Sequence, residues 1–288
     1  MDKIFILTPI KDDWEALNIL LSRISKYLNF SKKINILILD DCSKKIDINH
    51  NLIKKFENIT VVSLKKNYGS QRCIAIGIDF LIKKYLRFKL IIMDGDGEDN
   101  PSLIKNMLKL SKIYPEKAIL IYRTTRKENL VLKLLYELYI ILNFILTLKL
   151  IRFGNFSLIN RYHAEKMCKN NYLWFAYPPA IFKNSIKIQK IFAPKEKRYL
   201  GDSKMNYYKL FQHWLRILLP FKKRVFFITL FYLFIFMFIQ EKINLISFFF
   251  IIAYFFLVAL TLLLDKRIRA SKPKKLKDTI KRVKILKY

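Results

Sequence analysis

Residues 90–101 read Leu-Ile-Ile-Met-Asp-Gly-Asp-Gly-Glu-Asp-Asn-Pro. A short apolar run therefore ends in an Asp-x-Asp-x-Glu loop that holds the carboxylates of Asp94, Asp96 and Glu98. Mg²⁺ and Mn²⁺ prefer hard oxygen ligands of this kind. A divalent ion held there bridges protein carboxylates to a diphosphate and acts as a Lewis acid. Acidic loops after strands are also common as solvated turns. The choice between a metal–diphosphate site and a solvated turn therefore depends on the rest of the sequence.

Around this loop, residues 1–125 alternate two kinds of segment. Short apolar runs of the buried-strand type occupy residues 4–7, 34–39, 60–64, 90–93 and 118–122. Apolar residues at helical spacing mark residues 14–28, 70–86 and 101–113. The alternation predicts an α/β fold with a Rossmann-like, mostly parallel sheet and helices on both faces.

Acidic residues follow three of the predicted strands. They are Asp12 and Asp13 after the first strand, Asp40 and Asp41 after the second, and Asp94 and Asp96 after the fourth. In an open parallel sheet, ligands bind at the carboxyl ends of the strands. We therefore expect these carboxylates to converge on one crevice, which favours a ligand site over a solvated turn.

The chain is both basic and apolar. Its 288 residues include 54 Lys and Arg against 22 Asp and Glu, a formal net charge of +32, and 53% are hydrophobic. A basic balance fits nucleic acid, an anionic membrane surface or a phosphate-bearing substrate, and the hydrophobic content favours the membrane, so no nucleic-acid partner is expected. The three cysteines lack the spacing of a zinc site or a disulfide framework.

The carboxyl-terminal part changes character. Residues 225–239 and 243–264 are almost continuously apolar, which predicts a two-helix transmembrane hairpin over about 222–240 and 243–264. Basic residues precede the first span and follow the second. The positive-inside rule then places both termini and the catalytic part in the cytoplasm, at the inner (plasma) membrane as a multi-pass protein.

Two further segments are expected at the membrane surface. Residues 130–150 are strongly apolar but carry charges such as Lys133, Glu137 and Lys149, which disfavours a third span and favours an interfacial helix over about 128–150. The tail 266–288 mixes Lys and Arg with aliphatic residues, as expected for a helix on anionic lipid. A nucleic-acid-binding tail is the alternative, and attachment to two spans favours lipid. No signal peptide is expected, because the first apolar run is too short.

The predicted organisation is accordingly a cytoplasmic domain over 1–215 that includes the interfacial helix, two transmembrane helices within 216–265, and a basic cytoplasmic tail over 266–288. Self-association of the two-span anchor is left open, since the spans contain no decisive small-residue motif.

Six segments carry recognisable motifs: residues 8–13, 39–43, 67–71, 94–101, 154–158 and 198–206. Together they resemble the family 2 glycosyltransferases of the GT-A fold, and within them the polyprenyl-phosphate glycosyltransferases similar to dolichol-phosphate mannose synthase. Departures from the family pattern include Glu98 in place of Gln and Ser157 in place of Arg. The additional carboxylate of Glu98 leaves the metal, Mg²⁺ or Mn²⁺, undecided.

The resemblance implies roles for individual residues. The catalytic set would be Asp94, Asp96, Arg198, Ser203 and Lys204. The nucleotide would be bound by Pro9, Asp13, Asp40, Asp41, Asn67 and Gln71. The metal would be held by Asp94, Asp96 and Glu98. Independently of the resemblance, Arg123, Arg126 and Lys133 lie next to the predicted interfacial helix, which places them to bind the acceptor phosphate.

The implied reaction is a single inverting transfer of a sugar from a nucleotide-sugar to polyprenyl (undecaprenyl) phosphate, for cell-envelope glycan synthesis. A lipid phosphate is already an anion and attacks without a general base, whereas a hydroxyl needs one; the base and the additional motifs of hydroxyl-directed relatives are not seen after Pro101. A UDP-sugar is favoured by analogy only. Two alternatives stay open: transfer to a hydroxyl of a lipid-linked glycan, and a non-catalytic membrane partner.

Overall fold

The computed structural model describes residues 2–124, 130–201, 207–239 and 245–287. Its chain divides into two compact units. The first contains residues 1–128, 152–204 and 273–288, and the second contains residues 129–151 and 205–272. The helix expected over 128–150 is thus grouped with the later apolar helices, and residues 273–288 with the α/β part. The predicted boundary at 215 does not follow this division.

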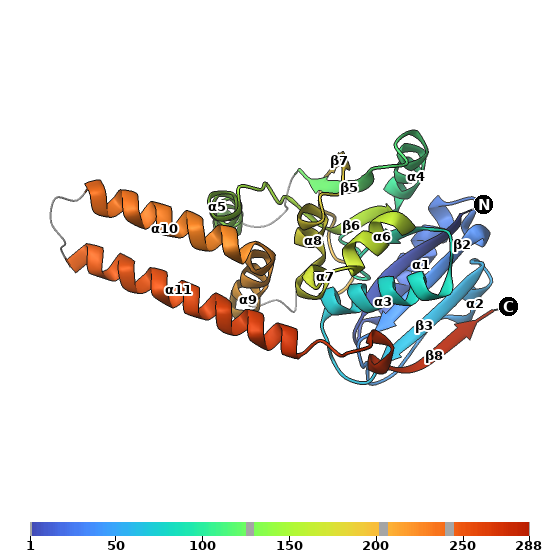
Figure 1. The fold of residues 1–288 in the computed structure, drawn as a ribbon. Helices are drawn as coiled ribbons and strands as arrows, with labels where there is room; N and C mark the ends of the chain where they lie inside the picture. Colours follow the sequence, from blue (N-terminus) through green and yellow to red (C-terminus); the bar gives the residue numbers. More distant parts are fainter. Residues whose placement is uncertain (1, 125–129, 202–206, 240–244, 288) are drawn as a thin grey trace. The chain divides into compact units, whose positions relative to one another are not determined.

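Within the described residues, the first unit contains one mixed sheet of eight strands in the order β7-β5-β6-β4-β1-β2-β3-β8 (Figure 1). The strands are β1 (Lys3–Ile10), β2 (Ile34–Asp40), β3 (Asn58–Leu64), β4 (Phe88–Ile92), β5 (Ala118–Arg123), β6 (Phe153–Asn160), β7 (Ile188–Ala193) and β8 (Ile280–Leu286). The five predicted strands are confirmed, and β6, β7 and β8 were not predicted.

Strands β4, β1, β2 and β3 form a parallel block, and β7 is parallel to β5. Strand β6 is antiparallel to both β4 and β5, and β8 is antiparallel to β3. The parallel block explains why its strands read as continuous apolar runs, because helices cover both of their faces.

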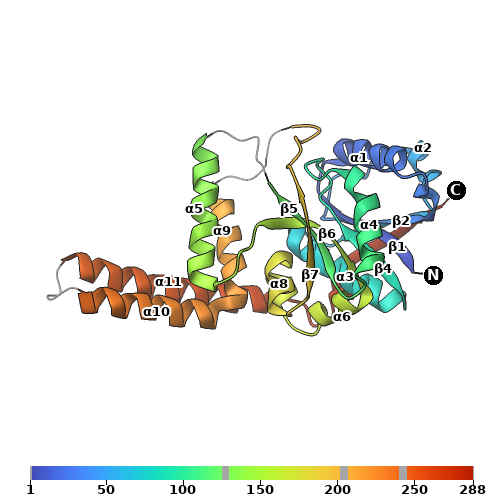
Figure 2. The ribbon, with the colours of Figure 1, turned by 90° about the horizontal axis from the view of Figure 1, so that it is seen from above.

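Helices of the first unit lie on both faces of this sheet (Figure 2). They are α1 (Trp14–Tyr27), α2 (His50–Ile53), α3 (Ser70–Lys84), α4 (Ile104–Ile113), α6 (Arg161–Cys168), α7 (Tyr172–Phe175) and α8 (Tyr177–Lys183). The apolar side chains of α1, α2 and α4 share a core with Ile6, Ile36 and Ile38 of the sheet. On the other face α3 packs so closely that a Cβ at Gly77 would overlap Leu7 and Leu39.

Beyond Ala270 the tail does not form the helix that we expected on anionic lipid. After the short helix η4 (Leu276–Thr279), β8 instead extends the sheet beside β3, with Val62 opposite Val283. The backbone N–H of Lys65 also donates to the Thr279 carbonyl at 2.9 Å. The physical reason is that the outer edge of β3 offers unpaired backbone groups, while Val and Ile in the tail favour an extended strand.

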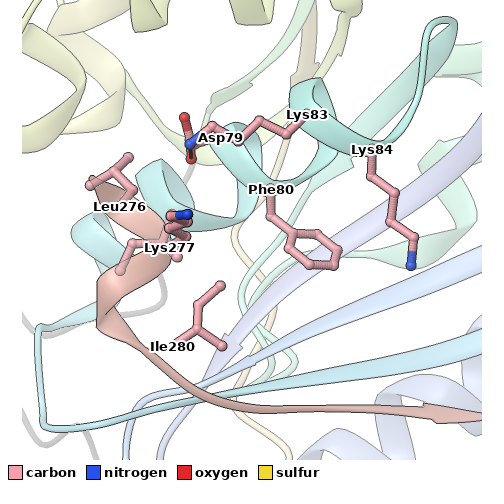
Figure 3. A pocket seen from close by; sticks show the side chains of 8 residues that line it. Asp79, Phe80, Lys83, Lys84, Leu276, Lys277 and Ile280 are labelled. Atoms are coloured by element: carbon pink, nitrogen blue, oxygen red, sulfur yellow. Dashed lines mark hydrogen bonds and ion pairs between the residues drawn. The ribbon is translucent and has the colours of Figure 1, made fainter.

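Helix α3 and η4 enclose a small pocket of about 190 Å³. Phe80 of α3 and Ile280 at the start of β8 point into the space between them, and lysines stand at its rim (Figure 3). None of the residues lining this pocket belongs to the predicted site. It marks the place where the C-terminal segment packs on α3.

Deletion of residues 280–288 is expected to accelerate amide hydrogen exchange of β3 about tenfold or more, since each net hydrogen bond contributes about 1 kcal/mol and several are lost. Strand β4 pairs with β1 and β6, so its exchange serves as the internal control. Peptide-level exchange with mass spectrometry measures both. Unchanged exchange of β3 would contradict the observed pairing.

The second unit is helical: α5 (Leu130–Thr147), α9 (Tyr207–Leu218), α10 (Lys222–Ile239) and α11 (Leu245–Ala270). Helices α10 and α11 lie side by side, with the rings of Phe236 and Phe250 centred 4.7 Å apart. Lys222 Nζ lies 2.6 Å from Asp265 Oδ2, so an ion pair joins the two helices at the end that carries the basic residues.

Among the described residues, one stretch is long and apolar enough to cross a membrane by length and composition, Phe248–Ala270 of α11. Helix α10 has apolar residues on all sides but, at 18 residues, is shorter than α11. The second predicted span and the connection at 240–244 are therefore not established by the structure, and that connection lies outside the described residues. Helix α5 exposes several large apolar side chains, namely Leu138, Ile141, Leu142, Phe144 and Ile145.

Candidate active site

The acidic loop follows β4 as predicted, and a second segment packs on it. Residues 194–200 follow β7, and the Tyr199 backbone N–H donates to the Asp96 carbonyl at 2.9 Å. Gly97 has a positive φ of 93°, and a Cβ there would lie 2.5 Å from the Tyr199 ring. Arg23 of α1 stacks on the same ring at 4.6 Å. Glycine at 97 is therefore required both by the turn and by the close approach of Tyr199.

Arg198 joins two of the acidic clusters. Its Nη1 lies 3.1 Å from Asp96 Oδ2, and its Nη2 lies 3.1 Å from Asp13 Oδ2. The guanidinium thus neutralises carboxylates from the loops after β1 and β4. The sequence expectation that these strand ends converge is confirmed for Asp13 and Asp96.

The three predicted metal ligands do not face one point. Asp94 accepts from Asn155, Asp96 pairs with Arg198, and Glu98 Oε1 lies 3.0 Å from Lys195 Nζ. Accordingly, no group of three or more His, Cys, Asp or Glu side chains poised to hold a metal is found in the part of the chain that is described. The oxygen donors themselves are of the type that Mg²⁺ or Mn²⁺ takes. They fit such an ion provided that it replaces the cationic side chains now paired with Asp96 and Glu98.

Burial and electrostatics distinguish the carboxylates of the loop. Burial, together with the neighbouring Asp99 and Asp96, raises the pKa of Asp94 to about 7, while the hydrogen bond from Asn155 opposes the rise. Asp99 is 3% exposed; burial raises its pKa, and the charge of Arg123 holds it down. The negative charge of the loop is therefore offset by Arg123, Arg198 and Lys195 and by the raised pKa of Asp94.

The predicted nucleotide-binding residues occupy different environments. Asp41 is buried and accepts from the backbone N–H groups of Tyr68 and Gly69 at 2.6 and 2.8 Å. Asp40 accepts from the Ser43 backbone N–H at 2.9 Å. Both carboxylates hold the turns at the ends of β2 and β3 in place. Asp13 is less buried than Asp40 and Asp41.

Three more members of the predicted nucleotide set differ in exposure. Pro9 is buried in β1, and Asn67 is exposed with its side chain accepting from the Gly69 backbone N–H. Gln71 is buried and is hydrogen-bonded to Asn155 and to the backbone of Tyr177. Of these three, only Asn67 presents its side chain to solvent.

Arg123, which we expected to bind the acceptor phosphate, points into the protein. Its Nη2 lies 3.4 Å from Asp99 Oδ1, and its side chain is 15% exposed. A Cβ at Gly154 would lie 3.3 Å from the same nitrogen. Arg126, Ser203 and Lys204 lie outside the described residues, as does the side chain of Lys133, although its backbone belongs to α5.

Sequence reasoning missed four side chains of this site. Asp99 partners Arg123, Lys195 partners Glu98, Tyr199 covers Gly97, and Asn155 donates to Asp94. A signal existed for Asn155, because an amide inside the apolar run of β6 has to find a hydrogen-bonding partner. Lys195 and Tyr199 become visible only when the segment after β7 is seen against the acidic loop, and Asp99 only when β5 brings Arg123 beside that loop.

A family model for Glycosyl transferase family 2 matches residues 5–175. This range covers more than half of the 288-residue chain, and the chain belongs to glycosyl transferase family 2. The enzyme class expected from the sequence, a glycosyltransferase, is confirmed.

Solved structures of low identity resemble the chain. TarS 1–349 of S. aureus, in complex with UDP-GlcNAc, has 13% identity and a TM-score of 0.47, covering 77% of this chain and 66% of that one. Glucosyl-3-phosphoglycerate synthase from Mycobacterium tuberculosis, with Mn²⁺, UDP and glucosyl-3-phosphoglycerate, has 13% identity and a TM-score of 0.49, covering 78% and 80%.

The mannosyltransferase PcManGT from Pyrobaculum calidifontis, with GDP-Man and Mn²⁺, has 10% identity and a TM-score of 0.44, covering 96% and 77%. The protein described here spans just under two thirds of the length of the TarS structure named above. No curated protein sequence matches the chain.

Proposed function

We propose that the protein transfers a sugar from a nucleotide-sugar, by preference a UDP-sugar, to polyprenyl phosphate at the inner membrane. The observation that carries the proposal is the acidic loop at the end of β4, whose Asp96 meets Asp13 through Arg198. A nucleoside diphosphate is an anion, so an acidic loop binds it through a cation. The family match supports sugar transfer as the chemistry.

The carboxylates of Asp94 and Asp96 would hold a divalent cation, Mg²⁺ or Mn²⁺, with Glu98 as a further oxygen donor. When bound, this cation neutralises the charge that grows on the leaving nucleoside diphosphate. Arg198 would move from Asp96 toward the phosphates, because a guanidinium makes charge-assisted hydrogen bonds to phosphoryl oxygens. Its present pairing keeps the acidic site neutralised until the donor arrives.

Acceptor chemistry favours a lipid phosphate over a hydroxyl. A phosphate monoester is anionic near neutral pH and attacks the anomeric carbon without a base, so the protein needs only to align it and stabilise the leaving group. The reaction is then one displacement with inversion. Ser203, Lys204, Arg126 and Lys133 stay candidates for contacts to the phosphates, whereas Arg123 is a weaker candidate because it faces Asp99.

Membrane attachment is part of the same proposal. Helix α11 would span the bilayer, and α10, which packs along it, would complete a two-helix hairpin with the catalytic part and both termini in the cytoplasm. The apolar side chains exposed on α5 suit an interfacial helix. Lysines and arginines at the ends of these helices suit anionic lipid headgroups.

The test is release of nucleoside diphosphate by the full-length protein in detergent, with Mn²⁺ or Mg²⁺ and a panel of UDP- and GDP-sugars. Release that depends on added undecaprenyl phosphate is the expected result and identifies the donor. Release that depends instead on a hydroxyl-bearing lipid-linked glycan would replace the acceptor in the proposal. Absence of both turnover and nucleotide binding would overturn it in favour of a non-catalytic membrane partner.

A further inference from the structure

A buried chain of side-chain amides ends on Asp94. Asn155 Nδ2 donates to Asp94 Oδ1 at 3.0 Å and to Oδ2 at 3.3 Å. Gln71 Nε2 donates to Asn155 Oδ1 at 3.0 Å. The backbone N–H of Tyr177 donates to Gln71 Oε1 at 2.8 Å. Gln71 and Asn155 are 8% and 7% exposed, so water competes little for these bonds.

The hydrogen bonds of this amide chain run in one direction, from the donor at Tyr177 to the acceptor at Asp94. A backbone N–H can only donate, so Tyr177 requires the oxygen of the Gln71 amide to face it. The Gln71 nitrogen then faces Asn155, whose oxygen accepts, and the Asn155 nitrogen is left to donate to Asp94. A carboxylate can only accept when ionised. These hydrogen bonds therefore form in one orientation only, and reversal of either amide would set two acceptors or two donors against each other.

Tyr177, which donates the first hydrogen bond of the amide chain, is itself fixed by a hydrogen bond. The Tyr177 hydroxyl lies 2.6 Å from Ser157 Oγ, and both residues are fully buried. Strand β6 thus carries both Ser157 and Asn155, and α8 carries Tyr177. Gln71 of α3 and Tyr177 of α8, which are 106 positions apart in the sequence, thus fix the orientation of one carboxylate at the end of β4.

We propose that Gln71 and Asn155 are positioning residues that orient the Asp94 carboxylate for the metal and diphosphate, a role that rests on the proposed function. Neither touches the substrate. Without the Asn155 donor, Asp94 is left facing the carboxylates of Asp96 and Asp99, and it turns away from its binding orientation. Gln71, which the sequence assigned to the nucleotide, acts on the site only through Asn155.

The first measurement is Mn²⁺ binding by the full-length protein in the presence of UDP, followed by electron paramagnetic resonance of free Mn²⁺. The variants Asn155→Leu and Gln71→Met keep side-chain size and remove the amides. Each is expected to weaken Mn²⁺ binding about 10- to 100-fold, as found for groups that orient metal ligands. The matched control is Asn35→Leu, which removes another buried amide, bonded to Glu57 and Asn58, and should leave binding unchanged.

A second measurement separates this inference from the proposed function. Gln71 and Asp94 do not form a hydrogen bond with each other, so the changes in the free energy of unfolding caused by Gln71→Met and by Asp94→Leu, which removes both acceptor oxygens, should simply add if Gln71 only packs in the core. If the amide chain couples the two residues, the two changes in stability are expected to be less than additive, as measured by thermal denaturation of the single and double variants. This comparison needs neither metal nor nucleotide.

The outcomes are distinct. Variants at 71 and 155 that bind Mn²⁺ as the Asn35→Leu control does, or changes in the free energy of unfolding that add, would overturn the positioning role. Wild-type protein that binds no Mn²⁺ with UDP would remove support from the proposed function, and the stability comparison alone would then decide for or against the role of Gln71 and Asn155.

Discussion

Replacement of Asp96 by asparagine is expected to reduce metal-dependent release of nucleoside diphosphate by about 10²- to 10³-fold, the usual effect of removing one preorganised electrostatic contact from an active site. Asp96 is the carboxylate of the acidic loop that meets Arg198, and through it Asp13. An amide keeps the shape of the side chain but removes the charge that would attract a divalent cation.

Steady-state release with the donor identified in the panel measures this effect. The stability of the variant should change little, because Arg198 keeps its ion pair with Asp13. A suitable control is Asp79→Asn, which removes a carboxylate paired with Lys83 on α3. Full activity of Asp96→Asn would contradict the assignment of the acidic loop, whereas equal losses in both variants would indicate a general effect of charge.

Replacement of Arg123 by methionine is expected to cost about 3–5 kcal/mol of the free energy of unfolding, because it leaves a buried carboxylate without its partner. That carboxylate is Asp99, which is 3% exposed and also accepts from the Asp94 backbone N–H at 3.0 Å. For a domain of this size such a loss lowers Tm by roughly 10 °C. Thermal or urea denaturation of the detergent-solubilised protein measures it.

A double variant tests the cause. Asp99→Asn in the Arg123→Met background removes the unpaired charge and should restore part of the stability. The loss in the single variant should also shrink as pH falls. Without Arg123 the pKa of Asp99 rises further in the folded state, and a carboxyl with a raised pKa stabilises the folded state when it is protonated and destabilises it as pH rises. A Tm equal to that of the wild type would show that the Arg123–Asp99 ion pair does not stabilise the folded state.

The sequence predicted the core of the α/β unit well because the relevant signals are local. Runs such as 34–39 and 90–93 are apolar throughout, and the structure places them in the interior of a sheet with helices on both faces. The local sequence pattern gave the wrong prediction for the tail, a surface helix. Residues 280–286 mix basic and aliphatic side chains in an order that suits an amphipathic surface helix, and only the free edge of β3 selects a strand.

In the candidate site, too, some features follow from the local sequence and others only from tertiary packing. By itself the sequence determined the acidic loop, its position after β4, the family, and the neighbourhood of Asp13 and Asp96, since strand ends of a parallel block meet at one edge. Only the tertiary structure decided which partner each carboxylate has. Arg198 reaches Asp13 across 185 residues and Gln71 reaches Asn155 across 84. Such contacts leave no local pattern, because they arise when buried polar groups, brought together by packing of the whole core, have to satisfy one another.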